Sequence, residues 1–222
     1  MTDRIRQLES DWSDRANTAG MTRRAVLFKR FPGWMNDYIH RQHVQFILEN
    51  WPARASSVLD LGCGYGRISD AIREQHPHTR FQGVDLCAPF AREYERTLGR
   101  CHVGPVQSFE PDDRFDVILF VTVLMYLDPS EQVAAVKRIA RALQPGGKVI
   151  CIEPAVEIQE TWRALTGRND ASPTGGSIHY FREPELRSLL QASGLAATTA
   201  RQIRLVPGVQ RTALHHLVAA KP

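Results

Sequence analysis

From residue 55 onward, short apolar runs alternate with amphipathic segments. The runs at 55–61, 80–86, 101–107 and 148–154 have the length and composition of buried strands. A longer run, FDVILFVTVLMYL at 115–127, begins as a strand and passes into a turn near its end. Nearly continuous apolar strands separated by helices are typical of a parallel sheet that is covered on both faces. The pattern therefore predicts an α/β protein with a doubly wound sheet.

The segments between these strands carry apolar residues at helical spacing. Helices are predicted at 68–75, 88–98 and 130–143, the last with Ser130 as its N-cap. The glycines and proline of QPGG, at 144–147, predict a turn that ends the third helix.

These elements divide the chain into four parts of one domain, residues 1–222. We expect an N-terminal helical cap at 1–52, a ligand-binding core at 53–154 and a substrate lid at 155–182. Residues 183–222 predict a helix followed by two strands that complete the sheet as a hairpin.

Charge and cysteine content narrow the range of partners and compartments but do not indicate a function. The net charge is +4, but the basic residues are scattered, which does not favour a nucleic-acid partner. No apolar stretch reaches the roughly 18 residues of a membrane span, so we expect no membrane partner and a cytoplasmic protein. The four cysteines have no CxxC pair and are interpreted as free thiols in a reducing compartment. The pattern leaves open a monomer or a homodimer.

The stretch VLDLGCGYGR, at 58–67, places three glycines at every second position after a predicted strand. Such a cluster indicates a tight turn, close packing, or a ligand lying against bare backbone. In doubly wound sheets the first strand-to-helix turn is a common ligand site. Asp85 ends the next strand, roughly 20 residues beyond Gly66, where a carboxylate accepts hydrogen bonds from ribose hydroxyls.

Two residues beside the glycines decide between two nucleotide-like ligands. A dinucleotide site has the spacing G-x-G-x-x-G, whereas here Arg67 stands where the last glycine would fall. Asp60, ahead of the glycines, disfavours a pyrophosphate and suits an ammonium or sulfonium centre. Charge therefore favours S-adenosyl-L-methionine over NAD, with S-adenosyl-L-homocysteine as product.

Four ordered motifs resemble those of the class I S-adenosylmethionine-dependent methyltransferase family, in particular its small-molecule branch. They are VLDLGCGYGR, FQGVDLC, FDVILFVTVLMYL and LQPGGKVICIEP. The likeness covers roughly residues 55 to 155, with weaker support to the C-terminus. It implies a Rossmann-like, mostly parallel seven-stranded sheet with a final antiparallel strand.

The resemblance also implies ten cofactor-binding positions. Those expected at the methionine end are Asp60, Gly62, Gly64, Gly66, Phe120 and Val121. Those expected at the nucleoside are Asp85 on the ribose, Leu86 and Val106 on the adenine, and Gln107. One departure is that GPVQSFEPDD lacks the acid that many relatives place after the third strand, so either Gln107 or Ser108 would make the polar contact with the adenine.

Methyl transfer to a hydroxyl or a protonated amine benefits from a general base. His179, at the close of the predicted lid, is the first candidate, and a packing or surface role is the alternative. Tyr126, just past the fourth strand, would orient the acceptor or pack in the core. His40 and His43 have the i, i+3 spacing of a metal pair but no third ligand, so no metal is expected; one would face solvent and the other line the cap.

The predicted cap and lid are rich in aromatic residues, which points to an apolar or aromatic acceptor or to packing on the sheet. These residues are Phe28, Phe31, Trp34, Tyr38 and Trp162. The leading hypothesis is methyl transfer to an oxygen or nitrogen of a small molecule, such as an aromatic natural product. Alternatives are a protein, quinone or lipid methyltransferase, a nicotinamide-dependent oxidoreductase, and a non-catalytic cofactor-binding module.

Overall fold

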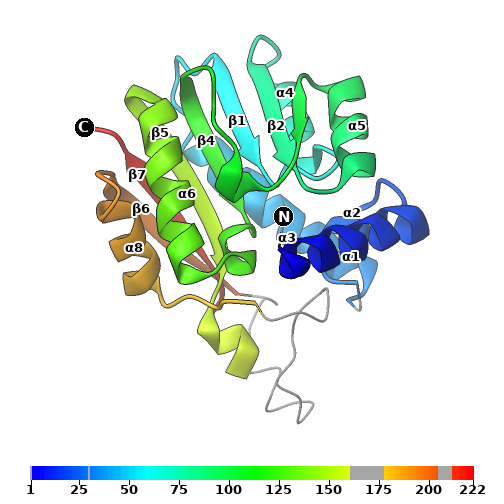
Figure 1. Cartoon of the computed structure of the whole chain (residues 1–222). Helices are drawn as coiled ribbons and strands as arrows, with labels where there is room; N and C mark the ends of the chain where they lie inside the picture. The colour runs from blue at the N-terminus through cyan, green and yellow to red at the C-terminus, as the bar shows by residue number, and fades with distance from the viewer. Residues whose placement is uncertain (1, 30, 161–177, 205–211) are drawn as a thin grey trace.

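The sheet has seven strands in the order β3-β2-β1-β4-β5-β7-β6 (Figure 1). The computed structural model describes residues 2–29, 31–160, 178–204 and 212–222. The strands are β1 (Ser57–Leu61), β2 (Arg80–Asp85), β3 (Cys101–Val103), β4 (Phe115–Val121), β5 (Leu143–Pro154), β6 (Ala196–Arg204) and β7 (Thr212–Ala220). The first five strands pair in parallel, and β7 is antiparallel to both of its neighbours. The predicted fold class and the C-terminal hairpin are confirmed.

Helices cover both faces of this sheet because its central strands are apolar on both sides. One face packs against α6 (Pro129–Ala142) and α8 (Glu183–Gln191). The other face packs against α3 (Gly33–Glu49), α4 (Arg67–Gln75) and Tyr94 of α5 (Ala88–Thr97). Every residue of β1 is buried, as expected for a strand enclosed by helices.

Three local details differ from the sequence predictions. The third strand is shorter, because residues after 103 turn into the 3-10 helix η1 (Val106–Ser108). The N-cap of α6 is Asp128 rather than Ser130, and it forms a capping box with Glu131. Residues 144–147 belong to β5, where the pairing with β4 shifts, and Gly146 takes the positive φ of 72° that this irregularity requires.

The first fifty residues form α1 (Asp3–Ala19), α2 (Arg23–Val26) and α3. In Figure 1, α1 lies at the lower right, below α5, on the side to which the arrows of β1 and β4 point. It contacts α2 and the start of α5 through a small apolar cluster that includes Ala16 and Phe90. In the part of the chain that the structure describes, no helix has the length and hydropathy that a bilayer crossing needs. The position of α1 closes the edge of the sheet where β1, β2 and β4 end.

Candidate active site

A cavity lies between α1 and the carboxyl ends of β1, β2 and β4. Residues from α1, the glycine loop, the end of β2, η1 and the turn after β4 form its wall. They are Arg4, Ile5, Leu8, Trp12, Val26, Asp60, Gly62, Cys63, Gly64, Arg67, Ile68, Asp85, Leu86, Phe90, Pro105, Val106, Gln107, Val121, Thr122, Val123, Tyr126 and Leu127. This is the edge at which ligands bind in doubly wound sheets.

The glycine loop combines a tight turn with close packing. The backbone N–H groups of Gly62 and Cys63 both donate to the carbonyl oxygen of Val84, which ties the loop to β2. Gly62 has a φ of +65°, and a Cβ there would lie 2.4 Å from Cγ2 of Val123. Gly64 lies against Val26 in the same way, at 3.1 Å. The bare backbone therefore keeps this part of the cavity wall open.

Two buried carboxylates, Asp60 and Asp85, stand at the ends of β1 and β2. Asp60 accepts a hydrogen bond from the Ser69 hydroxyl at 2.7 Å, and burial raises its pKa to about 7. Asp85 accepts from the backbone N–H groups of Gly64, at 2.7 Å, and Cys87, at 2.8 Å. Burial raises the pKa of Asp85 to about 6, against these two hydrogen bonds. Both acids line the cavity, and their predicted contacts with a cofactor stay a prediction.

The guanidinium of Arg67 lies near Asp60 and contacts two histidines of α3. It donates to Nδ1 of His40 and to Nδ1 of His43, each at 3.2 Å. Both histidines are buried, so the expectation that one of them faces solvent is wrong. Their Nδ1 atoms face a guanidinium, and burial followed by the charge of Arg67 lowers the pKa of both imidazoles. Arg67 thus joins the cavity wall to the helix behind it.

The turn after β4 is held by Glu153 of β5. Its buried carboxylate accepts hydrogen bonds from three backbone N–H groups, those of Val123 at 3.0 Å, Leu124 at 2.8 Å and Met125 at 3.2 Å. Immediately before them, Thr122 has a φ of 60°, the one positive value at a non-glycine residue in the described chain. The carboxylate therefore fixes a strained turn that carries part of the cavity wall.

Tyr126 ends this turn, in the 3-10 helix η2 (Leu124–Tyr126), and lines the cavity. Its ring meets the indole of Trp12 edge to face, with centroids 5.8 Å apart. Tyr126 thus connects the sheet edge to α1, and its predicted role in orienting an acceptor stays a prediction.

On the other side of the cavity, Leu86, Val106 and Gln107 line the wall where the nucleoside was expected. The Gln107 side-chain amide donates to Glu131 at 3.4 Å, and the Ser108 hydroxyl donates to the Pro105 carbonyl. Of the two candidates for the polar contact, Gln107 lines the cavity and Ser108 does not.

Two positions expected at the methionine end do not line the cavity. Gly66 packs against α5 instead, where a Cβ would lie 2.2 Å from Leu98. Phe120 is fully buried in the core beside α6. Successive residues of a strand point to opposite faces, so Phe120 packs away from the cavity while its neighbour Val121 lines it. In this structure both residues pack in the interior, and their predicted contact with a ligand stays a prediction.

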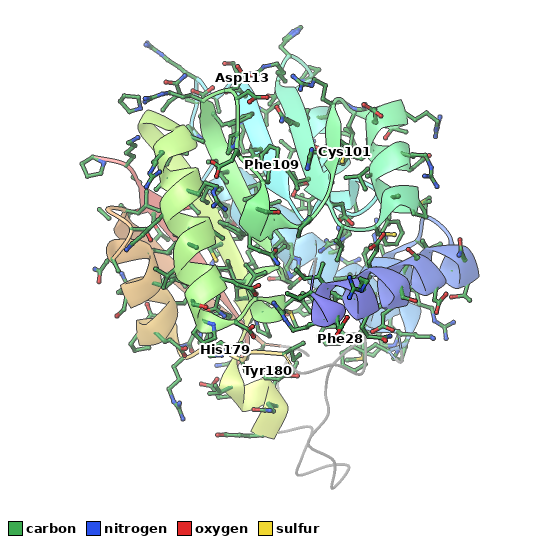
Figure 2. All side chains as sticks on the ribbon, viewed as in Figure 1. Phe28, Cys101, Phe109, Asp113, His179 and Tyr180 are labelled. Atoms are coloured by element: carbon green, nitrogen blue, oxygen red, sulfur yellow. The ribbon has the colours of Figure 1, made fainter. Side chains whose placement is uncertain are left out.

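His179 lies near the carboxyl ends of the strands, as Figure 2 shows, but not in the cavity wall. Its Nε2 atom is 2.6 Å from Oε1 of Glu185 in α8, and its ring meets Phe181 edge to face. These contacts favour the packing alternative, and the role of general base stays a prediction.

The cap aromatics contribute differently from the sequence expectation. Phe28 and Phe31 stack on one another, and Trp34 is exposed. Trp162 lies outside the described residues, as does the centre of the predicted lid. The cavity instead receives Ile5, Leu8 and Trp12. Their helical spacing is the signal that could have revealed this face of α1.

Taken together, the cavity has two carboxylates and bare loop backbone on the strand side and apolar residues of α1 on the other. The carboxylates suit a ligand with hydroxyl donors and a positive centre. The apolar side of α1 excludes water from such a ligand.

A family described as a methyltransferase domain matches residues 34–200. A carboxy-S-adenosyl-L-methionine synthase of Chromohalobacter salexigens is 28% identical over 72% of this chain and 61% of its own. A probable tRNA methyltransferase 9B of Bos taurus is 31% identical over 51% of this chain and 24% of its own. The chain thus spans less than two thirds of the length of these relatives.

Among solved structures, the 1,6-didemethyltoxoflavin-N1-methyltransferase of Burkholderia thailandensis superposes with a TM-score of 0.71. The match covers 97% of this chain and 88% of that one, at 22% sequence identity. That structure contains 1,6-didemethyltoxoflavin and S-adenosylhomocysteine. At this identity the likeness establishes a shared fold.

Proposed function

The chain belongs to the methyltransferase domain family, and from this premise we propose that it transfers the methyl group of S-adenosylmethionine to an oxygen or nitrogen of a small-molecule acceptor. The observation that carries the proposal is the pair of buried carboxylates, Asp60 and Asp85, beside the glycine loop. Asp85 retains lone pairs for ribose hydroxyls, since each of its oxygens accepts one backbone N–H. A positive centre beside Asp60 would stabilise its ionised form, whereas a pyrophosphate there would oppose it, which favours a cation-bearing nucleoside.

The bound cofactor would supply an activated methyl group on a sulfonium leaving group. The residues of this chain then have to position the acceptor and exclude water, which can account for roughly 7 to 11 kcal/mol of a barrier. Ile5, Leu8 and Trp12 provide the apolar cover, and the turn held by Glu153 provides a rigid wall. No histidine lines the cavity among the described residues, so an acceptor that arrives already nucleophilic fits this site best.

The acceptor class is the finer part of the proposal. The Burkholderia thailandensis enzyme is named for 1,6-didemethyltoxoflavin and the bovine relative for tRNA, so similar proteins are named for different acceptors. The scattered basic residues and the apolar cover formed by α1 support a small molecule over a nucleic acid. A protein, quinone or lipid acceptor is the alternative.

Calorimetry tests the cofactor assignment. S-adenosylmethionine should bind and NADH should not, and the reverse result would refute the proposal. Asp85→Ala should weaken S-adenosylmethionine binding by about 2 kcal/mol, because charge-assisted hydrogen bonds to the ribose are lost. Asp113→Ala is the matched control: this exposed acid pairs with Arg80 at the opposite end of the molecule (Figure 2) and should leave binding unchanged. Unchanged affinity in Asp85→Ala would remove that residue from the site.

Methyl transfer separates an enzyme from a binding module. Cell extract incubated with the protein and S-adenosylmethionine labelled in its methyl group should yield a labelled small molecule. Cofactor binding without any labelled product would favour the non-catalytic module.

A further inference from the structure

Arg15 of α1 is a buried cation that the cofactor site leaves unused. Its side chain is 4% exposed. Nη2 donates to the backbone carbonyl oxygens of Arg24 and Leu27. Nε and Nη1 are buried and have no hydrogen-bond partner, and within the described ranges no carboxylate forms an ion pair with Arg15. A buried guanidinium with two free nitrogens is costly unless an anion meets it.

The surroundings of Arg15 connect it to the cavity. Its guanidinium carbon lies 4.6 Å from the centroid of the Trp12 ring, which forms part of the cavity wall. Tyr126, another wall residue, is also close: burial raises its pKa, and the charge of Arg15 opposes that rise. The cation therefore lies directly behind two residues that face the ligand space.

The arginines that line the cavity, Arg4 and Arg67, are already occupied. Arg4 pairs with Glu131 and Asp128, and its guanidinium also donates to the Tyr126 carbonyl oxygen. Arg67 donates to two imidazoles and lies near Asp60. Among the arginines that the structure describes, Arg15 is the one that combines burial, unpartnered donor nitrogens and two wall residues as neighbours.

We propose that the methyl acceptor carries an oxyanion, either a carboxylate or a phenolate, on an apolar or aromatic body. Arg15, which lies behind Trp12 and Tyr126 and not in the cavity wall, binds this oxyanion where those two side chains move apart. The proposal rests on the proposed function and names its substrate class. The acidic ends of β1 and β2 hold the cationic donor, while α1 supplies the opposite charge for the acceptor.

An oxyanion also accounts for the absence of a histidine from the described cavity wall. When the anionic oxygen attacks the methyl carbon, an O–C bond forms and the C–S bond breaks. The electron pair of that bond stays on sulfur, so a sulfonium and an oxyanion become two neutral products. No proton moves, and the step needs no base. The product is a methyl ester from a carboxylate or an aryl methyl ether from a phenolate.

Matched aromatic probes that differ in charge test this inference. Protein saturated with S-adenosylhomocysteine would be titrated calorimetrically with 1-naphthoate and 1-naphthamide, and with 4-nitrophenolate and 4-nitroanisole. At least one anionic probe should bind about tenfold or more tightly than its neutral partner, since hydrogen bonds to charged groups contribute about 1.5–3 kcal/mol. The carboxylate pair and the phenolate pair distinguish the two sources of the oxyanion.

Variants then assign the preference to Arg15. Arg15→Gln should abolish the preference for the anionic probe, and Arg15→Lys should retain part of it, while both keep the affinity for S-adenosylhomocysteine. Arg6→Gln, an exposed arginine on the same helix, is the control and should bind like wild type. If Arg15→Gln loses S-adenosylhomocysteine as well, Arg15→Lys decides: a normal cofactor affinity with no anion preference would contradict the inference.

Failure of the inference is distinguishable from failure of the proposed function. If no anionic probe binds better than its neutral partner, including a panel in which none binds, the inference is overturned although S-adenosylmethionine still binds. If S-adenosylmethionine itself does not bind, the proposed function fails first.

Discussion

The buried carboxylates on the strand side of the cavity have hydrogen-bond partners within the protein, whereas some buried nitrogens of the N-terminal cap have none among the described residues. On the strand side, Asp60, Asp85 and Glu153 all accept hydrogen bonds from the protein itself. In the cap, Arg15 and His43 keep buried nitrogens without partners. The strand side is thus organised before any ligand arrives, whereas the cap contains groups whose partners the described chain does not supply. This difference is expected if the strand side binds a constant cofactor and the cap a variable acceptor.

The largest expected effect comes from filling the glycine loop with Gly62→Ala. The new Cβ would meet Val123 at 2.4 Å and would hold a left-handed φ, which costs an L-residue roughly 1–2 kcal/mol before the clash is counted. We expect at least about 2 kcal/mol loss in unfolding free energy and about 100-fold weaker S-adenosylmethionine binding, because the wall itself must move. Urea denaturation and calorimetry measure the two effects.

Gly33→Ala is the matched control, because nothing lies within 4 Å of a Cβ at the start of α3. It should leave both quantities close to wild type. An equal loss in the two variants would show that the strand side is no more rigid than the cap.

An intermediate effect should appear where the cap covers the sheet. His216 of β7 is fully buried, contacts His43 and Phe46 of α3, and has no partner for either ring nitrogen. Burial lowers its pKa to about 3, so below the ordinary value of 6.5 the unfolded chain binds a proton that the folded chain does not. Its contribution to stability is therefore present above pH 6.5 and lost as pH falls toward 3.

His216→Leu should remove this pH-dependent loss of stability. Relative to wild type, the free energy of unfolding of the variant should therefore increase by about 1.4 kcal/mol for each pH unit below 6.5. Urea midpoints at pH 7 and pH 5 measure the difference, which should reach about 2 kcal/mol at the lower pH. Comparing variant with wild type is necessary, because the raised pKa values of Asp60 and Asp85 make stability fall as pH rises. His78→Leu, at an exposed histidine, should show no such change, and parallel pH curves for His216→Leu and wild type would contradict the buried neutral state.

The smallest expected effect is at His179. Its contacts with Glu185 and Phe181 lie outside the cavity wall, so His179→Ala should change stability by less than about 1 kcal/mol and turnover by less than about twofold. The measurement is the rate of methyl transfer against pH, once an acceptor is in hand. A large loss of turnover with a changed pH profile would instead support the general base that the sequence suggested, and would extend the active site beyond the described cavity.

Much of the strand side could be predicted from the sequence because its signals are local. Asp60 and Asp85 lie at the carboxyl ends of apolar strands, and parallel strands end at one edge, so their meeting there was predictable. Gly66 and Phe120 were less predictable. Whether a loop glycine faces a ligand or a helix, and which face of a strand closes the cavity, depends on neighbours that are distant in sequence.

The cap shows the limit more clearly. The sequence indicated helices in the first fifty residues and an aromatic cover, but it pointed to Phe28, Phe31 and Trp34 instead of Trp12. Helical periodicity shows that α1 has an apolar face, but not what that face packs against. The role proposed for Arg15 depends on its hydrogen bonds to the carbonyl oxygens of Arg24 and Leu27. It also depends on the nearby ring of Tyr126, which follows β4.

The sequence by itself determined the fold class, the glycine loop and the two acids, because turn chemistry and strand periodicity act over a few residues. Only the tertiary structure decided which side chains of the cap reach the cavity. Those contacts join residues as distant as Arg4 and Glu131, which are 127 positions apart, and arise from the packing of α1 across the sheet edge. The backbone preference of a segment is set by the residues of that segment. The position of the cap over the cavity depends on contacts throughout the fold.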